Sequence, residues 1–339
     1  MSVIGVLTAG GDCPGLNAVI RGIVVRAHEN HDAEVVGIMN GWEGLMDGDV
    51  KLLGPGDVTD ILAKGGTVLG TSRKDPYVHG DGYASVAKTI KRNDIDTLIV
   101  IGGDGTLRTA LRLAEDGAKV VGVPKTIDND INGTDFTFGF NTAVQIVTDA
   151  IDRLTTTAEA HNRVILVEVM GRTKGWIATY GGIAGGAQAI LIPEVPYDLD
   201  EVTALIRRRH RRGKNYSVVV VAEGVEPPQK VEHQKDIFGF DRLGGVAYQL
   251  APVIERLTGY ETRVTVLGHL QRGGTPSAFD RVLATRLGAK AADLAAEGQH
   301  GTMVAMRGAE IVAVPLSEGC AEIRGVDQPL YDVAQTFFG

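Results

Sequence analysis

A short acidic segment carries the residue types that proton transfer beside a metal ion needs. Thr126, Asp128 and Asp130 lie at alternate positions directly after an apolar run, and Lys125 precedes them. A hydroxyl followed by two carboxylates suits the removal of a proton from an alcohol. Phosphoryl transfer requires such a base close to a positioned alcohol, together with cations around the moving group. The plainer alternative is a turn rich in Asp and Asn that only caps the chain.

Two glycine-rich turns follow other apolar runs. Gly10, Gly11 and Asp12 form the first turn, and residues 102–106, Gly-Gly-Asp-Gly-Thr, form the second. Ligands of α/β sheets bind beyond the carboxyl ends of strands, where the next helix presents free N–H groups. Glycine lets phosphate oxygens approach those groups, and an aspartate such as Asp104 can hold the Mg²⁺ that accompanies a polyphosphate. The alternative is that the glycines merely close the turns.

Other nucleotide-binding motifs are missing from the sequence. It contains neither G-x-G-x-x-G nor G-x-x-x-x-G-K-[ST], which argues against dinucleotide hydride chemistry and P-loop hydrolysis. The run Gly-Gly-Asp-Gly-Thr also occurs in NAD kinases and lipid kinases. A kinase of NAD or of lipids would explain this run but not the acidic segment that contains Asp128 and Asp130.

Short apolar strands must position these turns. In the first part of the chain the pattern predicts strands at residues 3–8, 34–39, 97–101 and 119–123, and helices at 17–29, 82–92 and 106–115. A second series predicts helices at 141–157, from 175 onward, at 198–212 and at 242–257, and strands at 163–169, 189–192, 216–222 and 261–267. Residues 225–240 are expected to form an exposed loop. The alternation predicts two similar α/β domains with helices on both faces of parallel sheets.

Composition narrows the class of protein further. The chain has 339 residues, 44% of them hydrophobic and 22% charged, which is typical of a globular protein. A net charge of −8 argues against nucleic-acid binding. Two cysteines cannot make a disulfide framework, and no apolar run is long enough for a signal peptide or a membrane span. We therefore expect a cytoplasmic protein with no nucleic-acid or membrane partner.

Together these motifs closely resemble the phosphofructokinase family, from residue 4 to about residue 286. The words that carry the resemblance are Gly10-Gly11-Asp12, Gly102-Gly103-Asp104-Gly105-Thr106, Lys125-Thr126-Ile127-Asp128-Asn129-Asp130, Met170-Gly171-Arg172 and Leu267-Gly268-His269-Leu270-Gln271-Arg272-Gly273-Gly274. The resemblance implies two similar Rossmann-like three-layer α/β domains with the active site in the cleft between them. It assigns residues 1–140 and about 271–318 to a larger domain that binds the phosphoryl donor and Mg²⁺. Residues 141–270 and 319–339 form a smaller domain for fructose 6-phosphate.

The resemblance also implies the chemistry. Asp128 looks like the base that accepts the proton of the sugar 1-hydroxyl, with Thr126 and Asp130 beside the transferred group. Arg172 resembles the arginine that donates to the phosphoryl oxygens, for which a rigid guanidinium fork is suited. Asp104 would hold Mg²⁺ with help from Asp130.

Further roles follow from the same motifs. The donor phosphates would lie against residues that the resemblance groups together: Gly11, Arg73, Asp104, Gly105, Thr106 and Lys125. Sugar recognition would involve Thr126, Asp128, Asp130, Met170, Gly171, Arg172, Glu223, His269 and Arg272. Arg163 and Arg263 match arginines that family members lend to the 6-phosphate site of a neighbouring subunit, so the resemblance implies a homotetramer with shared sites.

Two positions point to different donors. Gly105 is typical of members that use ATP, because a carboxylate at this place would repel and crowd the α-phosphate. Lys125 resembles the pyrophosphate users, in which a lysine could cap the terminal phosphate. A carboxylate at position 105 could forbid ATP, whereas a lysine at position 125 need not, so we give Gly105 more weight than Lys125. We therefore expect ATP as the donor, with pyrophosphate as the alternative. A more remote alternative is a non-catalytic sugar-phosphate sensor, although such a protein would be expected to lose Asp128 or Arg172.

Overall fold

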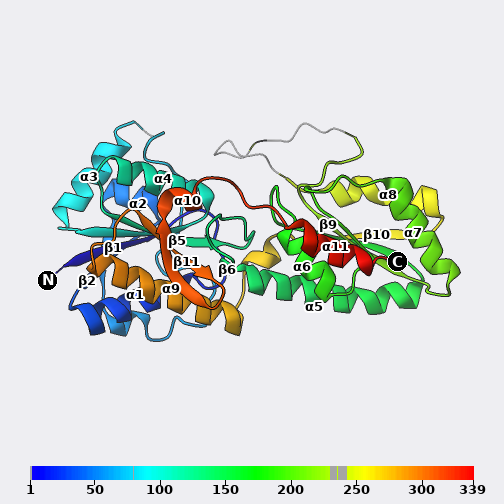
Figure 1. Ribbon diagram of the computed structural model, residues 1–339, viewed down its shortest axis with the longest axis horizontal. Helices are drawn as coiled ribbons and strands as arrows, with labels where there is room; N and C mark the ends of the chain where they lie inside the picture. The colour runs from blue at the N-terminus through cyan, green and yellow to red at the C-terminus, as the bar shows by residue number, and fades with distance from the viewer. Residues whose placement is uncertain (1, 79, 230–234, 236–242) are drawn as a thin grey trace. The chain divides into compact units, whose positions relative to one another are not determined.

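The structure is a computed structural model that describes residues 2–78, 80–229, 235 and 243–339. The chain divides into two compact units, and the sequence crosses between them three times. Unit 1 comprises Met1–Thr142 and Arg272–Ile323, and unit 2 comprises Ala143–Gln271 and Arg324–Gly339 (Figure 1). Most of the expected loop at 225–240 and the expected start of a helix at 242 fall outside the described residues.

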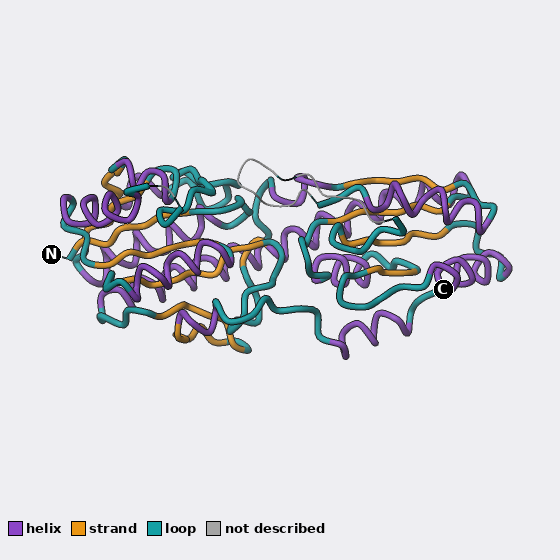
Figure 2. The backbone as a smooth tube through the Cα atoms, turned by 90° about the horizontal axis from the view of Figure 1, so that it is seen from above, coloured by secondary structure: helices purple, strands orange, loops and turns teal. Residues whose placement is uncertain are grey.

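Unit 1 is built on an eight-stranded sheet with the order β12-β11-β5-β4-β1-β2-β3, and β6 pairs with β5. Figure 2 draws the strands in orange and the helices in purple. The strands are β1 (Val3–Thr8), β2 (Glu34–Ile38), β3 (Val50–Leu53), β4 (Thr97–Gly102), β5 (Val120–Thr126), β6 (Phe138–Gly139), β11 (Thr302–Arg307) and β12 (Glu310–Pro315). The central strands are parallel, whereas β3 and β12 run antiparallel to their neighbours at the two edges. Every position of β4 and β5 is buried, as helices on both faces of a parallel sheet require.

Helices cover both faces of this sheet, which makes unit 1 a three-layer structure (Figure 1). One face packs against α2 (Trp42–Asp47), α3 (Gly82–Arg92), α4 (Asp104–Glu115) and α10 (Leu316–Gly319). The other is covered by α1 (Leu16–His31) and α9 (Ala278–Ala296). These two helices approach backbone to backbone, since a Cβ on Gly22 would lie 2.7 Å from the Thr285 carbonyl oxygen. The predicted α/β class and the helices on both faces are confirmed.

An ionic network joins the ends of α1 and α9. Arg26 Nε lies 2.7 Å from Asp293 Oδ1, and His31 Nε2 lies 2.7 Å from the same oxygen. Burial alone would raise the pKa of the Asp293 carboxyl, but the hydrogen bonds from Arg26 and His31 outweigh burial and lower this pKa below its ordinary value. The folded state therefore favours the ionised carboxylate.

Asp293→Asn should destabilise unit 1 by about 1–2 kcal/mol at pH 7, because the network loses its charge. Since the pKa of Asp293 is lowered on folding, its contribution is fully present above the ordinary value of about 4. It is lost as the pH falls through the lower pKa of the folded state. Thermal unfolding midpoints of the two proteins should differ at pH 7 and converge in strong acid. Equal midpoints at pH 7 would show that the network contributes nothing.

Unit 2 contains a four-stranded parallel sheet with the order β10-β7-β9-β8. Its strands are β7 (Val164–Val169), β8 (Ala189–Leu191), β9 (Ser217–Ala222) and β10 (Thr262–Val266). Its helices are α5 (Phe140–His161, whose first three residues belong to unit 1), α6 (Trp176–Ala184), α7 (Leu199–Arg211), α8 (Val246–Thr258) and α11 (Gln328–Thr336). Short 3₁₀ turns lie at Pro55–Val58 in unit 1 and at Gly268–Arg272, where the chain returns to unit 1.

Most element bounds differ from the sequence prediction by one or a few residues, and three of the differences have a visible cause. α4 begins at Asp104, two residues early, because an acidic side chain in the first turn suits the helix dipole. β5 extends to Thr126 because β6 pairs with its last residues. α8 begins at Val246, after two glycines with positive φ, and the buried Glu168 carboxylate accepts the N–H groups of Gly245 and Ala247.

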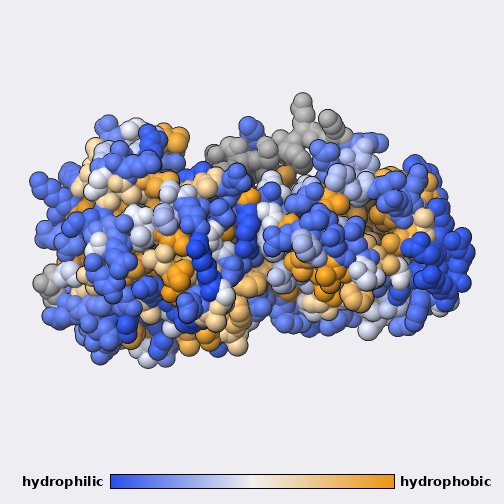
Figure 3. All heavy atoms as spheres, viewed as in Figure 1, coloured by the Kyte–Doolittle hydropathy of each residue, from blue (hydrophilic) through white to orange (hydrophobic). Residues whose placement is uncertain are grey.

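The surface is mainly polar. Hydrophilic side chains cover most of the face drawn in Figure 3, interrupted by smaller apolar patches on each unit. Within the described residues, every helix is too short or too polar to cross a lipid bilayer.

Candidate active site

The first glycine turn lies at the carboxyl end of β1, where it meets side chains from other elements of unit 1. The ammonium of Lys125, which lies in β5, donates to the Gly11 carbonyl oxygen. Arg272 Nη1 donates to the Asp12 carbonyl oxygen at 3.2 Å, and a Cβ on Gly11 would lie only 2.5 Å from the same nitrogen. A side chain at position 11 would therefore displace this guanidinium. Two cations thus meet at one stretch of backbone.

Lys125 is the most deeply placed of these charges. Its side chain is 3% exposed. Burial lowers the pKa of the ammonium, and the nearby Arg272 guanidinium acts in the same direction. The neighbouring Cys13 thiol is fully buried, and burial raises its pKa to about 12, so it acts as a packing group rather than a nucleophile.

The second glycine turn lies beside the first because β4 pairs with β1. A Cβ on Gly10 would lie 3.3 Å from the Thr106 hydroxyl oxygen, so the two turns are in contact. Gly105 is exposed, and a Cβ built on it has no heavy atom within 4 Å. Asp104, in the first turn of α4, is paired with Arg108 one turn later. This edge of the sheet therefore offers helix N–H groups, open space and one carboxylate.

A loop that precedes α3 is hydrogen-bonded to the first glycine turn. The Thr71 hydroxyl donates to the Gly10 carbonyl oxygen at 2.7 Å, and the Gly10 N–H donates to the Ser72 carbonyl oxygen at 2.9 Å. Arg73 follows directly and is exposed. Sequence reasoning selected Arg73 but did not identify Thr71 and Ser72, whose role depends on contacts with Gly10, which lies far away in the sequence.

The acidic segment follows β5 and is almost completely buried. Thr126 Oγ1 accepts the Asp128 N–H at 3.0 Å, so the hydroxyl fixes the turn that carries the carboxylate. Asn129 has a φ of 52°, in the left-handed region, and its side chain accepts the Thr137 N–H at 2.9 Å. Asp128 is 4% exposed, and its Oδ1 is buried without a hydrogen-bond partner. A buried carboxylate oxygen without a partner is costly, so this oxygen is open to a hydrogen bond from a bound molecule.

In unit 2, the turn that begins at Met170 forms where β7 and β9 end side by side. Met170 is buried, and its N–H donates to the side chain of fully buried Gln271 at 3.3 Å. Arg172 is exposed and has a φ of 53°, and its N–H donates to Glu223 Oε1 at 2.9 Å. Backbone in this region is strained, and such strain is concentrated at functional sites. The structure therefore brings Met170, Gly171, Arg172 and Glu223 together.

Arg163 and Arg263 lie near the opposite ends of the strands of unit 2. Arg163 Nε lies 2.7 Å from Glu261 Oε2, and Arg263 donates to the other oxygen of the same carboxylate. Sequence reasoning missed Glu261, although an acid two residues before one arginine was a visible signal. Both hydrogen bonds lower the pKa of its carboxyl. The length of β7, about 20 Å at 3.3 Å per residue, separates this pair from Met170.

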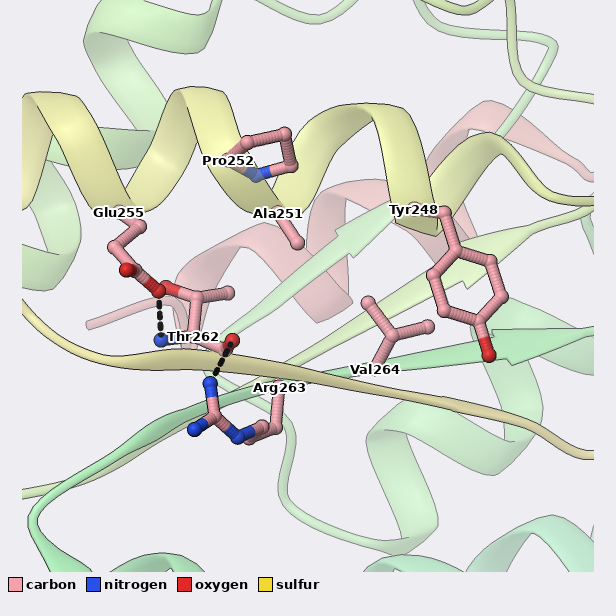
Figure 4. A pocket seen from close by; sticks show the side chains of 7 residues that line it. All are labelled: Tyr248, Ala251, Pro252, Glu255, Thr262, Arg263 and Val264. Atoms are coloured by element: carbon pink, nitrogen blue, oxygen red, sulfur yellow. Dashed lines mark hydrogen bonds between the residues drawn. The ribbon is translucent and has the colours of Figure 1, made fainter.

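Arg263 also lines a shallow groove between α8 and β10. Its other lining residues are Tyr248, Ala251, Pro252, Glu255, Thr262 and Val264 (Figure 4). The Tyr248 ring is largely exposed. His269, in the turn after β10, is exposed as well.

The residues selected from the sequence are divided between the two units. Unit 1 contains Gly11, Arg73, Asp104, Gly105, Thr106, Lys125, Thr126, Asp128, Asp130 and Arg272; unit 2 contains Arg163, Met170, Gly171, Arg172, Glu223, Arg263 and His269. Across the part of the chain that the structure describes, no three His, Cys, Asp or Glu side chains are placed to hold a metal ion. A single carboxylate together with polyphosphate oxygens still fits Mg²⁺, which keeps few protein ligands.

This arrangement of glycine turns, two cations and a buried carboxylate with one unpartnered oxygen is typical of a phosphoryl-transfer site on an α/β fold. The family model described as "Phosphofructokinase" matches residues 3–295. The chain belongs to the phosphofructokinase family.

Relatives and solved structures agree with this assignment. The chain is 52% identical to a protein of Amycolatopsis methanolica named "Pyrophosphate--fructose 6-phosphate 1-phosphotransferase", over 99% of each chain. It is also 52% identical, over 99% of each chain, to a protein of Mycobacterium tuberculosis (strain ATCC 25618 / H37Rv) named "ATP-dependent 6-phosphofructokinase". The solved phosphofructokinase of Saccharomyces cerevisiae superposes with a TM-score of 0.83 at 32% identity, covering 99% of this chain and 47% of that chain.

Proposed function

We propose that this chain transfers a phosphoryl group to the 1-hydroxyl of fructose 6-phosphate and gives fructose 1,6-bisphosphate, a step of glycolysis in the cytoplasm. The observation that carries the proposal is Asp128, whose buried Oδ1 has no hydrogen-bond partner in a unit that also contains two phosphate-type glycine turns. A buried carboxylate oxygen that has no hydrogen-bond partner within the protein suits a base that accepts a proton from an alcohol.

Each group of residues has a role in this proposal. In unit 1, Thr126 fixes the turn of Asp128, Asp130 lies beside the transferred group, and Lys125 and Arg272 supply positive charge. The donor phosphates lie against Gly11, Arg73, Gly105 and Thr106. In unit 2, Arg172 donates to the phosphoryl oxygens, while Met170, Gly171, Glu223 and His269 recognise the sugar. Unit 1 is therefore the donor-binding unit and unit 2 the sugar-binding unit.

Mg²⁺ enters with the donor in this proposal. Asp104 would hold it, with help from Asp130, and the ion would neutralise charge on the donor oxygens. Lys125 and Arg272, which meet at the Gly11 turn, would also neutralise charge on the donor oxygens. The role left to Asp128 is that of the base that accepts the proton.

A homotetramer with shared sites is part of the proposal. Arg163 and Arg263 lie about the length of a strand from the Met170 turn of their own unit, which supports their use by a neighbouring copy. Glu261 keeps the two guanidiniums together, and Arg263 lines the groove shown in Figure 4. The 6-phosphate of fructose 6-phosphate is a suitable anion for such a pair of arginines.

ATP is the donor that we favour. Gly105 is exposed and has open space around it, so nothing contributed by this residue obstructs a donor longer than pyrophosphate. Lys125, the residue that resembles the pyrophosphate users, already donates to the Gly11 carbonyl oxygen and is deeply buried. Pyrophosphate remains the second candidate because equally similar relatives carry either donor in their names.

The test is formation of fructose 1,6-bisphosphate from fructose 6-phosphate and Mg²⁺, with ATP and pyrophosphate compared side by side. We expect turnover with ATP and at least tenfold less with pyrophosphate. The reverse preference would contradict the proposed donor but not the reaction. Absence of turnover with both donors, from protein that binds fructose 6-phosphate, would favour a non-catalytic sugar-phosphate sensor.

A further inference from the structure

The carboxylate of Asp104 is engaged by a guanidinium from its own helix. Arg108 Nε lies 2.8 Å from Asp104 Oδ1 and 3.0 Å from Oδ2, so one donor group faces both carboxylate oxygens. The two residues are four positions apart on α4, which places their side chains on one face of the helix. A carboxylate shared in this way has less negative charge available for a cation.

Arg108 has neighbours other than Asp104. The buried thiol of Cys320, directly after α10, lies near both Asp104 and Arg108. α10 itself packs against α4. About half of the Arg108 side chain is exposed, against 28% of Asp104. Such a pair is weak enough to open when a stronger ligand arrives.

The next arginine on α4 behaves differently. The Arg112 guanidinium lies 3.8 Å from the centre of the Tyr77 ring, away from Asp104. Two arginines one turn apart on the same helix therefore differ in their partner: one holds the carboxylate of the donor turn, and the other covers an aromatic ring. This difference provides a matched control.

We infer that Arg108 is a positioning residue that holds Asp104 and weakens its affinity for a divalent cation while the donor is absent. The metal then binds together with the polyphosphate and not ahead of it. A dication placed at Asp104 must break the pair with Arg108 and is repelled by the guanidinium, whereas donor phosphates add the negative charge that offsets both costs. The inference rests on the proposed function, because it takes Asp104 as the carboxylate that meets the metal of the donor.

The experiment measures Mn²⁺ binding by electron paramagnetic resonance, with concentrated protein and no donor, in about 0.15 M salt to screen distant charges. Arg108→Met should tighten Mn²⁺ binding by about three- to tenfold relative to the parent. Arg112→Met should change it by less than about twofold, because that charge does not touch Asp104. Arg108→Lys should fall between the parent and Arg108→Met, since the charge remains but the fork is lost.

Two further measurements separate this inference from the proposed function. Asp104→Asn should abolish the gain caused by Arg108→Met when the two changes are combined. With imidodiphosphate or imido-ATP present, the parent and Arg108→Met should bind Mn²⁺ with affinities closer together than without a donor. Unchanged or weaker donor-free binding in folded Arg108→Met overturns the inference. If Asp104→Asn does not weaken Mn²⁺ binding in the presence of either analogue, the metal is not at Asp104 and that part of the proposed function fails instead.

Discussion

Replacing Asp128 with asparagine should lower kcat by about 10²–10⁴-fold, while the apparent affinity for the phosphoryl donor changes little. Asparagine keeps the size of the side chain and can still lie in the buried turn. It cannot accept a proton at neutral pH, so the sugar hydroxyl must ionise without a base. Because donor phosphates contact the glycine turns and cations instead, their binding should not depend on this carboxylate.

The structure explains why the loss should be large at Asp128 and small at the exposed Asp135. Asp128 Oδ1 is buried without a partner, and the Thr126 hydroxyl fixes the position of the backbone N–H of Asp128. Asp135 lies seven residues after Asp128 but is exposed, and its carboxylate accepts the Gly308 N–H at 2.7 Å. Asp135→Asn is therefore a matched control that removes a negative charge nearby.

The measurement is the steady-state rate at saturating fructose 6-phosphate with each donor, alongside the thermal unfolding midpoint of each variant. Asp135→Asn should keep kcat within about threefold, as surface substitutions usually do. A folded Asp128→Asn protein with nearly normal kcat would remove Asp128 as the base. Equal losses in both variants would point to a general effect of charge on the segment.

Much of this site was predictable because local sequence determines it. The strands before the three turns are buried at nearly every position, as their continuous apolar runs predicted. Parallel neighbours end at the same edge of a sheet, so the turns after β1, β4 and β5 meet there. The helix of Asp104 was placed two residues too late, because the pattern of apolar residues does not register an acidic first turn.

The contacts that tune the site were not predictable in the same way. Arg272 reaches the Gly11 turn across 260 residues of sequence, and β6 extends β5 only after the acidic segment has folded back. Glu261 and Arg108 look like ordinary surface charges until the structure gives their partners. Spacing along the chain specifies which residues can act, whereas tertiary contact decides which charges are already paired.

Gly105→Asp should reduce kcat/KM with ATP by about tenfold to several hundredfold and change kcat/KM with pyrophosphate by less than about threefold. A carboxylate about 4–5 Å from a phosphate costs about 1–4 kcal/mol at effective dielectric constants between those of water and a protein surface. The substitution should not unfold the protein, because a Cβ at Gly105 meets no heavy atom within 4 Å and the residue lies in the first turn of a helix. The added charge would also suit the positive end of that helix.

Gly105→Asn is the control that separates charge from size, since asparagine has nearly the same shape as aspartate and no charge. If repulsion is the cause, Gly105→Asn should retain most of the activity with ATP, and the loss in Gly105→Asp should shrink at high salt. If both variants lose ATP use equally, crowding at the open position is the cause. If neither does, the donor extends in another direction from this turn. In that case Gly105 does not select the donor, and Lys125, buried against the Gly11 carbonyl, becomes the residue to change next.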